Sequence, residues 1–226
     1  MEDTEGFASR VDHTLLGKDH TVTDVEEAVR EASEYGTNVC LPPSRVEDAE
    51  RLADALDFDG ELVTVVGFPH GTSPSEVKAF EAERVVENGA TEVDVACNVS
   101  FLKSGEHDDF RDDIGEVIRS VGSRVTVKAI IETGLLTREE KERAAELCAD
   151  AGADYVKTCT GFSEGEGTVE DVQLLDEALD GRAEIKASGG IGSYDEAVSL
   201  LEAGASRIGA SSGTEIVEEY LETTGR

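Results

Sequence analysis

The sequence predicts one (β/α)₈ barrel, a TIM barrel, formed as a single domain by residues 1–226. Short strand-like runs alternate with amphipathic helical segments, and this alternation implies a parallel sheet. Three lysines, Lys128, Lys157 and Lys186, each stand late in a strand-like run and recur 29 residues apart. Dividing the 226 residues among eight strands gives units of about 28, which matches that spacing.

The strands are expected at runs rich in β-branched and apolar residues. In chain order they are a short strand near Ser9–Thr14 and the runs NVCL (38–41), LVTVVGF (62–68), EVDVAC (92–97), RVTVKAII (124–131), DYVKTC (154–159), AEIKAS (183–188) and RIGAS (207–211). A doubly wound open sheet is the alternative fold, but no G-x-G-x-x-G motif follows the first strand.

Helices are expected between these strands. The segments 74–90, 137–153, 169–181 and 193–205 carry apolar residues every three or four positions, and a glycine stands at or near the end of each. No linker and no shift in composition divides the chain. The pattern therefore favours one continuous domain.

The chain is strongly acidic, with 51 Asp and Glu against 20 Lys and Arg and a formal net charge of −31. This balance argues against nucleic acid or an anionic membrane as a partner. Hydrophobic residues make up 38% of the chain in clear strand and helix patterns, so the acidity does not indicate disorder. The acids spread along helix faces, and 13 arginines outnumber 7 lysines. We therefore expect a halophilic protein that works in concentrated salt, where repulsion between charges is screened.

The cysteines and histidines do not suggest a metal site. The four cysteines (Cys40, Cys97, Cys148 and Cys159) are dispersed without a C-x-x-C pair, so buried reduced thiols are expected. The four histidines (His13, His20, His70 and His107) have no spacing suited to a metal. Surface or turn positions are expected for all four, although His13 and His70 lie near strand ends.

The sequence predicts a cytoplasmic location. The segment MEDTEGFASR lacks both an apolar signal core and basic flanks. No run of apolar residues approaches the length needed to span a membrane.

Alternation within the strands predicts which side chains enter the barrel. In EVDV the two valines share one face and Asp94 takes the other, and in VTVKA Lys128 likewise opposes the apolar residues. The apolar faces should pack on the helices, so Asp94, Lys128, Lys157 and Lys186 should point inward. Their positions late in each strand place them near the carboxyl end of the barrel, where barrel enzymes bind and transform substrates.

Inward lysines have a chemical use. Burial and a second ammonium nearby both lower the pKa of a lysine, and a neutral amine attacks carbonyl groups. Two such lysines on adjacent strands form a candidate pair in which one is a Schiff-base nucleophile and the other stays charged. The alternative is that the lysines are ion-pair partners on the helix side, but three at the same point of successive units favour a function. Asp94 would either carry protons or neutralise a lysine.

Two turns rich in Gly and Ser are candidates for a phosphate site. They are SGGIGSYDEA after the seventh strand and GASSGTEI after the eighth, and each opens a helix. The loops after these two strands are where barrels hold phosphate on backbone N–H groups. Because the chain as a whole repels anions, a phosphate would depend on these local donors and a lysine. The two turns together predict a phosphorylated substrate.

Eight stretches, in order from residue 11 to residue 213, resemble the deoxyribose-phosphate aldolase family of DeoC-type class I aldolases. They are VDHTLL (11–16), NVCLPPSRV (38–46), VVGFPHG (65–71), EVDVACNVSFLKSG (92–105), VKAIIETGLLT (127–137), ADYVKTCTGF (153–162), IKASGGI (185–191) and RIGASSG (207–213). The resemblance implies reversible cleavage of 2-deoxy-D-ribose 5-phosphate to D-glyceraldehyde 3-phosphate and acetaldehyde, in deoxyribose phosphate catabolism. It implies no metal and no cofactor.

The resemblance also implies roles for residues. Lys157 in VKTCTG matches the Schiff-base lysine, Lys186 in IKASGG matches the second lysine that exchanges protons and tunes the nucleophile, and Asp94 in EVDV matches the acid/base aspartate. Lys128 matches an interior lysine that is not the nucleophile, and Asp12 and Thr14 match the N-terminal strand beside the active site. The substrate phosphate is expected against Gly161, Gly189, Gly190, Ser211 and Ser212.

Two features depart from the family pattern. Some members end in a tail whose tyrosine reaches the active site, whereas this chain ends YLETTGR, with Tyr220 expected in the last helix. His70 stands where leucine is expected. Two other functions stay open, namely another lysine-dependent aldolase or transaldolase acting on a different sugar phosphate, and a barrel that binds sugar phosphates without catalysis. The family usually forms a homodimer or homotetramer.

Overall fold

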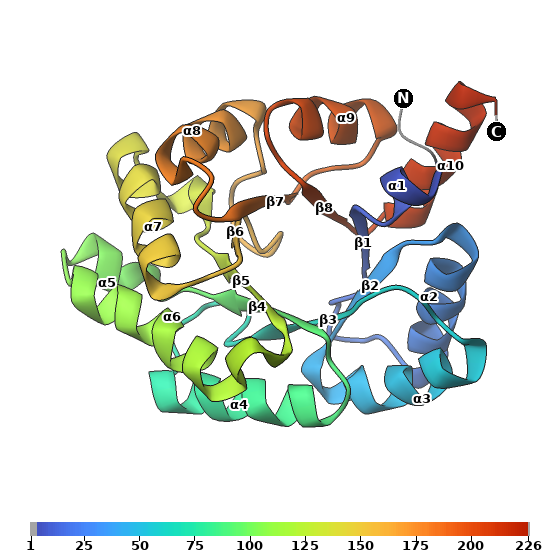
Figure 1. The fold of residues 1–226 in the computed structure, drawn as a ribbon, viewed down its shortest axis with the longest axis horizontal. Helices are drawn as coiled ribbons and strands as arrows, with labels where there is room; N and C mark the ends of the chain where they lie inside the picture. Colours follow the sequence, from blue (N-terminus) through green and yellow to red (C-terminus); the bar gives the residue numbers. More distant parts are fainter. Residues whose placement is uncertain (1–3, 226) are drawn as a thin grey trace.

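A computed structural model describes residues 4–225 of the chain. Eight parallel strands follow one another in sequence order around a closed barrel, and the last pairs with the first. Helices surround the strands on all sides (Figure 1). The predicted (β/α)₈ fold is confirmed. The strands are β1 (Val11–Thr14), β2 (Asn38–Leu41), β3 (Leu62–Val66), β4 (Glu92–Ala96), β5 (Thr126–Ile130), β6 (Tyr155–Lys157), β7 (Glu184–Ser188) and β8 (Arg207–Ala210).

All eight expected strands form, and most are shorter than the runs that predicted them. The run 62–68 overshoots β3 because Gly67 has φ +63°, a left-handed conformation that ends an extended segment. The run 154–159 contains only the three residues of β6. Residues are lost at both ends of these runs, and those lost after β3, β4, β5, β6 and β8 lie at the carboxyl ends of the strands, where the site lies.

The outer layer consists of helices, of which α1 precedes the first strand and the others follow the strands. They are α1 (Thr4–Ala8), α2 (Val22–Tyr35), α3 (Val46–Leu56), α4 (Ser75–Glu87), α5 (Val99–Lys103), α6 (His107–Val121), α7 (Arg138–Ala151), α8 (Val169–Leu179), α9 (Tyr194–Glu202) and α10 (Gly213–Thr224), with short 3₁₀ turns at Pro43–Arg45, Gly122–Arg124 and Thr133–Leu135. Within the described residues, no helix is both long and apolar enough to cross a membrane.

Local signals fix where these helices begin and end. α7 starts at a capping box, in which Thr137 Oγ1 accepts from the backbone N–H of Glu140 and the Glu140 carboxylate accepts from that of Thr137. The same helix ends at Gly152, whose φ of +92° suits a residue without a side chain. The expected helix over 137–153 is thus confirmed to within two residues at each end.

The strands separate an apolar outer layer from a polar interior. The outward residues Val93 and Val127 pack with Ala82 of α4 and Val117 of α6 in one buried cluster. The inward faces of β4, β5, β6 and β7 carry Asp94 and the three lysines instead, as alternation predicts. Hydrophobic burial therefore lies mainly between sheet and helices, which leaves the interior available for charged groups.

The first and last helices, α1 and α10, pack against each other beside the barrel (Figure 1). Tyr220 lies in α10 as predicted, and its ring stacks on Phe7 of α1 with 4.6 Å between ring centroids. This contact keeps Tyr220 buried, away from the barrel interior. The four cysteines are all buried and free, which confirms the expectation of reduced thiols.

Candidate active site

Asp94 lies at the centre of the barrel interior and contacts all three inward lysines. Its Oδ1 lies 3.1 Å from Nζ of Lys128. Its Oδ2 lies 2.7 Å from Nζ of Lys157 and 2.7 Å from Nζ of Lys186. The sequence-based expectation that these four side chains point into the barrel is confirmed.

The even lysine spacing conceals a difference in depth. Lys157 on β6 and Lys186 on β7 are direct register partners, so they lie at the same level of the barrel. Lys128 on β5 pairs instead with Tyr155, two residues before Lys157. Because barrel strands are staggered, the same 29-residue step leaves Lys128 closer to the amino ends of the strands.

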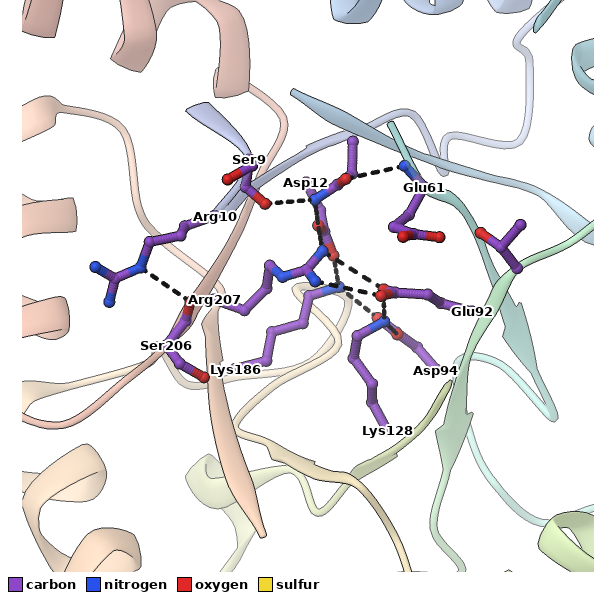
Figure 2. Close-up of polar contacts among 12 residues, drawn as sticks. Ser9, Arg10, Asp12, Glu61, Glu92, Asp94, Lys128, Lys186, Ser206 and Arg207 are labelled. Atoms are coloured by element: carbon purple, nitrogen blue, oxygen red, sulfur yellow. Dashed lines mark hydrogen bonds and ion pairs between the residues drawn. The ribbon is translucent and has the colours of Figure 1, made fainter. Parts of the chain in front are cut away.

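Further ion pairs extend from Lys186 toward the amino ends of the strands. Lys186 Nζ lies 2.5 Å from Asp12 Oδ2, and Arg207 Nη1 lies 2.8 Å from Asp12 Oδ1. Arg207 Nη2 also lies 3.2 Å from Glu92 Oε1, and Glu92 pairs with Lys128. Figure 2 shows these side chains converging from strands on opposite sides of the barrel.

The charge states of the central residues follow from these contacts. Burial alone would raise the pKa of Asp94, but Lys128, Lys157 and Lys186 together hold that pKa well below its ordinary value. Burial alone would lower the pKa of Lys186, but Asp12 and Asp94 outweigh it and raise that pKa above its ordinary value. Asp94 therefore stays a carboxylate and Lys186 an ammonium at neutral pH.

The two supporting residues are held charged in the same way. Burial favours the neutral acid of Asp12, but Lys186, Arg207 and Lys128 hold its pKa below the ordinary range. For Lys128, the cost of burial is outweighed by Asp94, and its pKa is raised. Lys128 is fully buried and contacts two carboxylates, which fits the interior support expected from sequence.

Lys157 differs from the other two lysines in partners and in access. Lys128 and Lys186 each contact two carboxylates, whereas Lys157 contacts Asp94 through an oxygen that it shares with Lys186. Of the three, Lys157 lines the large cavity at the carboxyl ends of the strands. It is therefore the lysine whose amine a small carbonyl compound can reach.

That cavity has a volume of about 530 Å³, in the range of small-molecule sites. Its walls come from the loops after β1, β6, β7 and β8. Every residue expected at the phosphate lines it, and so does Thr14, whereas Asp12 lies deeper. The five expected residues are Gly161, Gly189, Gly190, Ser211 and Ser212.

Backbone conformation explains the glycines in this wall. Gly161, Gly189 and Gly190 have φ values of +79°, +94° and +78°, which other residues rarely adopt. A Cβ on Gly190 would also lie 2.6 Å from Cγ of Glu166. Beyond Ser212 begins α10, whose first N–H groups lie beside the cavity wall, an arrangement that favours an anion.

The expectation for the histidines is partly wrong. His70 and His107 are exposed, as expected. His13 is buried in β1 on the helix side, with Nε2 3.4 Å from Glu31 Oε2, because odd positions of this strand face outward. His20 follows β1 in a turn but lines the main cavity. His70 borders a smaller adjoining hollow of about 120 Å³.

Sequence reasoning missed Glu92 and Arg207. Glu92 stands two residues before Asp94, so alternation places it on the same inward face and would have identified it. Arg207 opens β8 and gives no comparable signal, because its role depends on reaching Glu92 across the barrel. Within residues 4–225, no group of three or more His, Cys, Asp or Glu side chains is arranged to hold a metal ion.

Comparison with known proteins matches residues 7–219 to the DeoC/LacD family aldolase model. The chain belongs to this aldolase family. A deoxyribose-phosphate aldolase of Caldanaerobacter subterraneus subsp. tengcongensis is 46% identical over 222 residues, which cover 97% of this chain and 95% of the relative. A deoxyribose-phosphate aldolase of Natronomonas pharaonis is 47% identical over 218 residues, 96% of each chain.

Solved aldolase structures agree with this assignment. The aldolase QR15 superposes with a TM-score of 0.93 at 37% identity, covering 99% of this chain and 98% of QR15. The tetrameric deoxyribose phosphate aldolase of Aeropyrum pernix superposes with a TM-score of 0.90 at 35% identity, covering 98% of this chain and 93% of the relative. The chain is thus a class I aldolase, an enzyme that breaks and forms carbon–carbon bonds through a lysine amine.

Proposed function

We propose that this aldolase reversibly cleaves 2-deoxy-D-ribose 5-phosphate to D-glyceraldehyde 3-phosphate and acetaldehyde, with Lys157 as the Schiff-base lysine. The observation that carries the assignment is that Lys157, unlike Lys128 and Lys186, lines the cavity. It also contacts a single carboxylate, Asp94, through an oxygen that Lys186 contacts as well. The names of the relatives support the substrate. The glycine-rich wall supports its phosphate.

The proposed reaction begins at Lys157. Its neutral amine attacks the aldehyde carbon C1 of the open-chain sugar, and loss of water gives a protonated imine. A water molecule held by Asp94 takes the proton of the C3 hydroxyl, and the C2–C3 bond breaks with its electron pair moving into the imine. D-Glyceraldehyde 3-phosphate leaves, and the two carbons that remain on Lys157 form an enamine.

The second half of the proposed reaction needs a proton at C2. The contacts keep Lys186 an ammonium and Asp94 a carboxylate, so the two can hold a water molecule between them. This water gives C2 the proton that it took from the C3 hydroxyl. Hydrolysis of the resulting imine releases acetaldehyde and restores Lys157.

The phosphate would lie in the wall formed by Gly161, Gly189, Gly190, Ser211 and Ser212. Backbone N–H groups and the amino end of α10 would bind it. The side chain of Lys157 is engaged in the chemistry, so these neutral donors carry most of the recognition. Binding of the phosphate by nearby backbone donors suits a chain whose net charge of −31 repels anions at long range.

A direct test combines trapping with a coupled assay in high salt. Borohydride reduction in the presence of acetaldehyde is expected to leave an adduct on Lys157, located by peptide mass spectrometry. Release of D-glyceraldehyde 3-phosphate from the deoxy sugar should be lost in Lys157→Ala. Trapping of a ketone substrate but not of acetaldehyde would instead indicate an aldolase for another sugar phosphate. Binding of phosphate esters without any product would indicate a barrel without catalysis.

We also propose that the enzyme works as a homodimer or homotetramer in concentrated salt. The tetrameric relative from Aeropyrum pernix supports self-association. The net charge of −31 supports the need for salt, because self-repulsion is screened there. Light scattering after size exclusion measures the assembly. Dialysis to low salt should lower the melting temperature, and an unchanged melting curve would argue against the salt requirement.

A further inference from the structure

Six side chains, five of them buried and that of Arg207 half-buried, form a closed ring of alternating charge in the barrel interior. The ring runs from Asp94 to Lys186, Asp12, Arg207, Glu92 and Lys128 and back to Asp94, and each neighbouring pair is an ion pair. Figure 2 shows all six converging. Three cations face three anions, so the ring carries no net charge when every member is ionised.

Lys157 is attached to this ring at Asp94 without being a member of it. A protonated Lys157 gives the seven side chains one net positive charge, whereas a neutral Lys157 leaves them balanced. A net charge in a buried, poorly solvated site costs free energy, and ring members are each held by two opposite charges. Lys157 is therefore the cation among the seven side chains whose charge the ring leaves unbalanced.

The far side of the ring has no part in the proposed chemistry. Arg207 and Glu92 are the first residues of β8 and β4, and neither lines the cavity. Arg207 reaches across the barrel to Glu92 with Nη2–Oε1 3.2 Å and holds Asp12 with Nη1–Oδ1 2.8 Å. Its guanidinium also lies 5.9 Å from the centre of the Tyr155 ring.

We propose that Arg207 and Glu92 are positioning residues that close the ring and thereby set how readily Lys157 loses its proton. The proposal rests on Lys157 being the reactive amine. Arg207 acts through Asp12 on Lys186, and Glu92 acts through Lys128 on Asp94. Apart from the half-buried Arg207, the residues that link these ion pairs are buried, so water screens the pairs weakly.

Besides its six members and Lys157, the described titratable groups beside the ring include Tyr155 on β6 and the buried thiol of Cys40 on β2. Glu61, just before β3, and Glu184, which opens β7 two residues before Lys186, stand on inward faces at the amino ends of the strands, and Glu184 is exposed to solvent. Burial raises the pKa of Cys40 to about 11, so this thiol stays neutral in the range of interest. The charge of the interior is thus set by the seven ion-paired residues.

Two single substitutions should act in opposite directions. Arg207→Met removes a positive charge, so a protonated Lys157 then completes a balanced core and keeps its proton to higher pH. Glu92→Gln removes a negative charge, so the core repels the proton on Lys157 and releases it at lower pH. The double variant restores the balance, and Arg207→Lys keeps the charge with a single donor group.

The experiment measures the free amine directly. Labelling of Lys157 by acetic anhydride is followed against pH in high salt by peptide mass spectrometry, with exposed Lys18 as the internal reference. The midpoint should move by about one pH unit upward in Arg207→Met and by about one unit downward in Glu92→Gln. The double variant and Arg207→Lys should lie near the wild type. Circular dichroism in the same salt checks that each variant is folded.

A purely structural role predicts a different result. Midpoints that shift together in one direction, or that stay unchanged in all folded variants, would overturn the proposal. Acetaldehyde trapping by borohydride is measured separately. Opposed midpoint shifts without any trapped adduct would support the charge ring and refute the proposed aldolase role of Lys157.

Discussion

Lys78 and Lys157 are both buried, and each donates to an aspartate over 2.7 Å, yet their surroundings differ. Lys78 belongs to α4, where it binds Asp113 of α6 and donates to the carbonyl of Ala96 over 2.8 Å. Lys157 shares the oxygen of its aspartate with a second lysine and lines a cavity. Burial and an ion pair therefore do not distinguish Lys157 from Lys78. The shared carboxylate oxygen and the access to a cavity do.

The two lysines are linked through strand β4. Ala96, which accepts from Lys78, ends the strand that carries Asp94. The chain of Lys78 also packs on Gly67, where a Cβ would lie 3.0 Å from Lys78 Cε. Lys78 thus contacts the carboxyl ends of β3 and β4 from the helix side. Lys157 contacts Asp94 of β4 from inside the barrel.

The largest expected effect is the loss of the reactive amine. Lys157→Ala should lower the cleavage rate on the order of 10⁴-fold or more, because no other lysine among the described residues lines the cavity to form the imine. The coupled assay for D-glyceraldehyde 3-phosphate measures it. Lys78→Met is the matched control and should still give the borohydride adduct on Lys157. A cleavage rate within tenfold of the wild type in Lys157→Ala would contradict the assignment.

The next effect is on stability and concerns Lys78. Lys78→Met leaves the buried carboxylate of Asp113 without its cation, so the free energy of unfolding should fall by about 3–5 kcal/mol. Replacing both partners, as in Lys78→Met with Asp113→Leu, removes the unpaired charge and should recover most of that loss. Denaturant unfolding in high salt measures both variants. A double variant no more stable than the single one would refute the ion-pair explanation.

Removal of the charged partner of Lys157 should have a smaller effect that depends on pH. Asp12 and Asp94 hold the pKa of Lys186 above its ordinary value, so its positive charge persists across the working range. Without it, Lys157 keeps its proton to higher pH. Lys186→Met should therefore lose about 10²-fold in kcat/KM at neutral pH and less at alkaline pH. Lys186→Arg is the control that keeps the positive charge. A loss of kcat/KM in Lys186→Met that is equal at every pH would indicate that only a proton carrier has been removed.

Strand alternation predicted the inward faces of β4 to β7, because a period of two is fixed by backbone geometry. The same alternation places Glu92 on the inward face with Asp94, so Glu92 could have been predicted from the sequence. The depth of Lys128 was not predictable, since it depends on the stagger between β5 and β6. The buried ion pair of Lys78 could not be predicted for a similar reason. Its partner Asp113 is 35 residues away on another helix, and only helix packing brings them together.

The smallest expected effect tests the cavity wall beside Lys157. Gly161 and Gly181 have φ values of +79° and +74°, and a Cβ on either would meet no atom within 4 Å. Alanine at either site should cost about 1 kcal/mol of stability through backbone strain. Only Gly161 lines the cavity, so only Gly161→Ala should raise KM for the phosphorylated substrate, by about tenfold. Steady-state kinetics compare the two variants. Equal KM values would mean that the turn at Gly161 does not contact the phosphate.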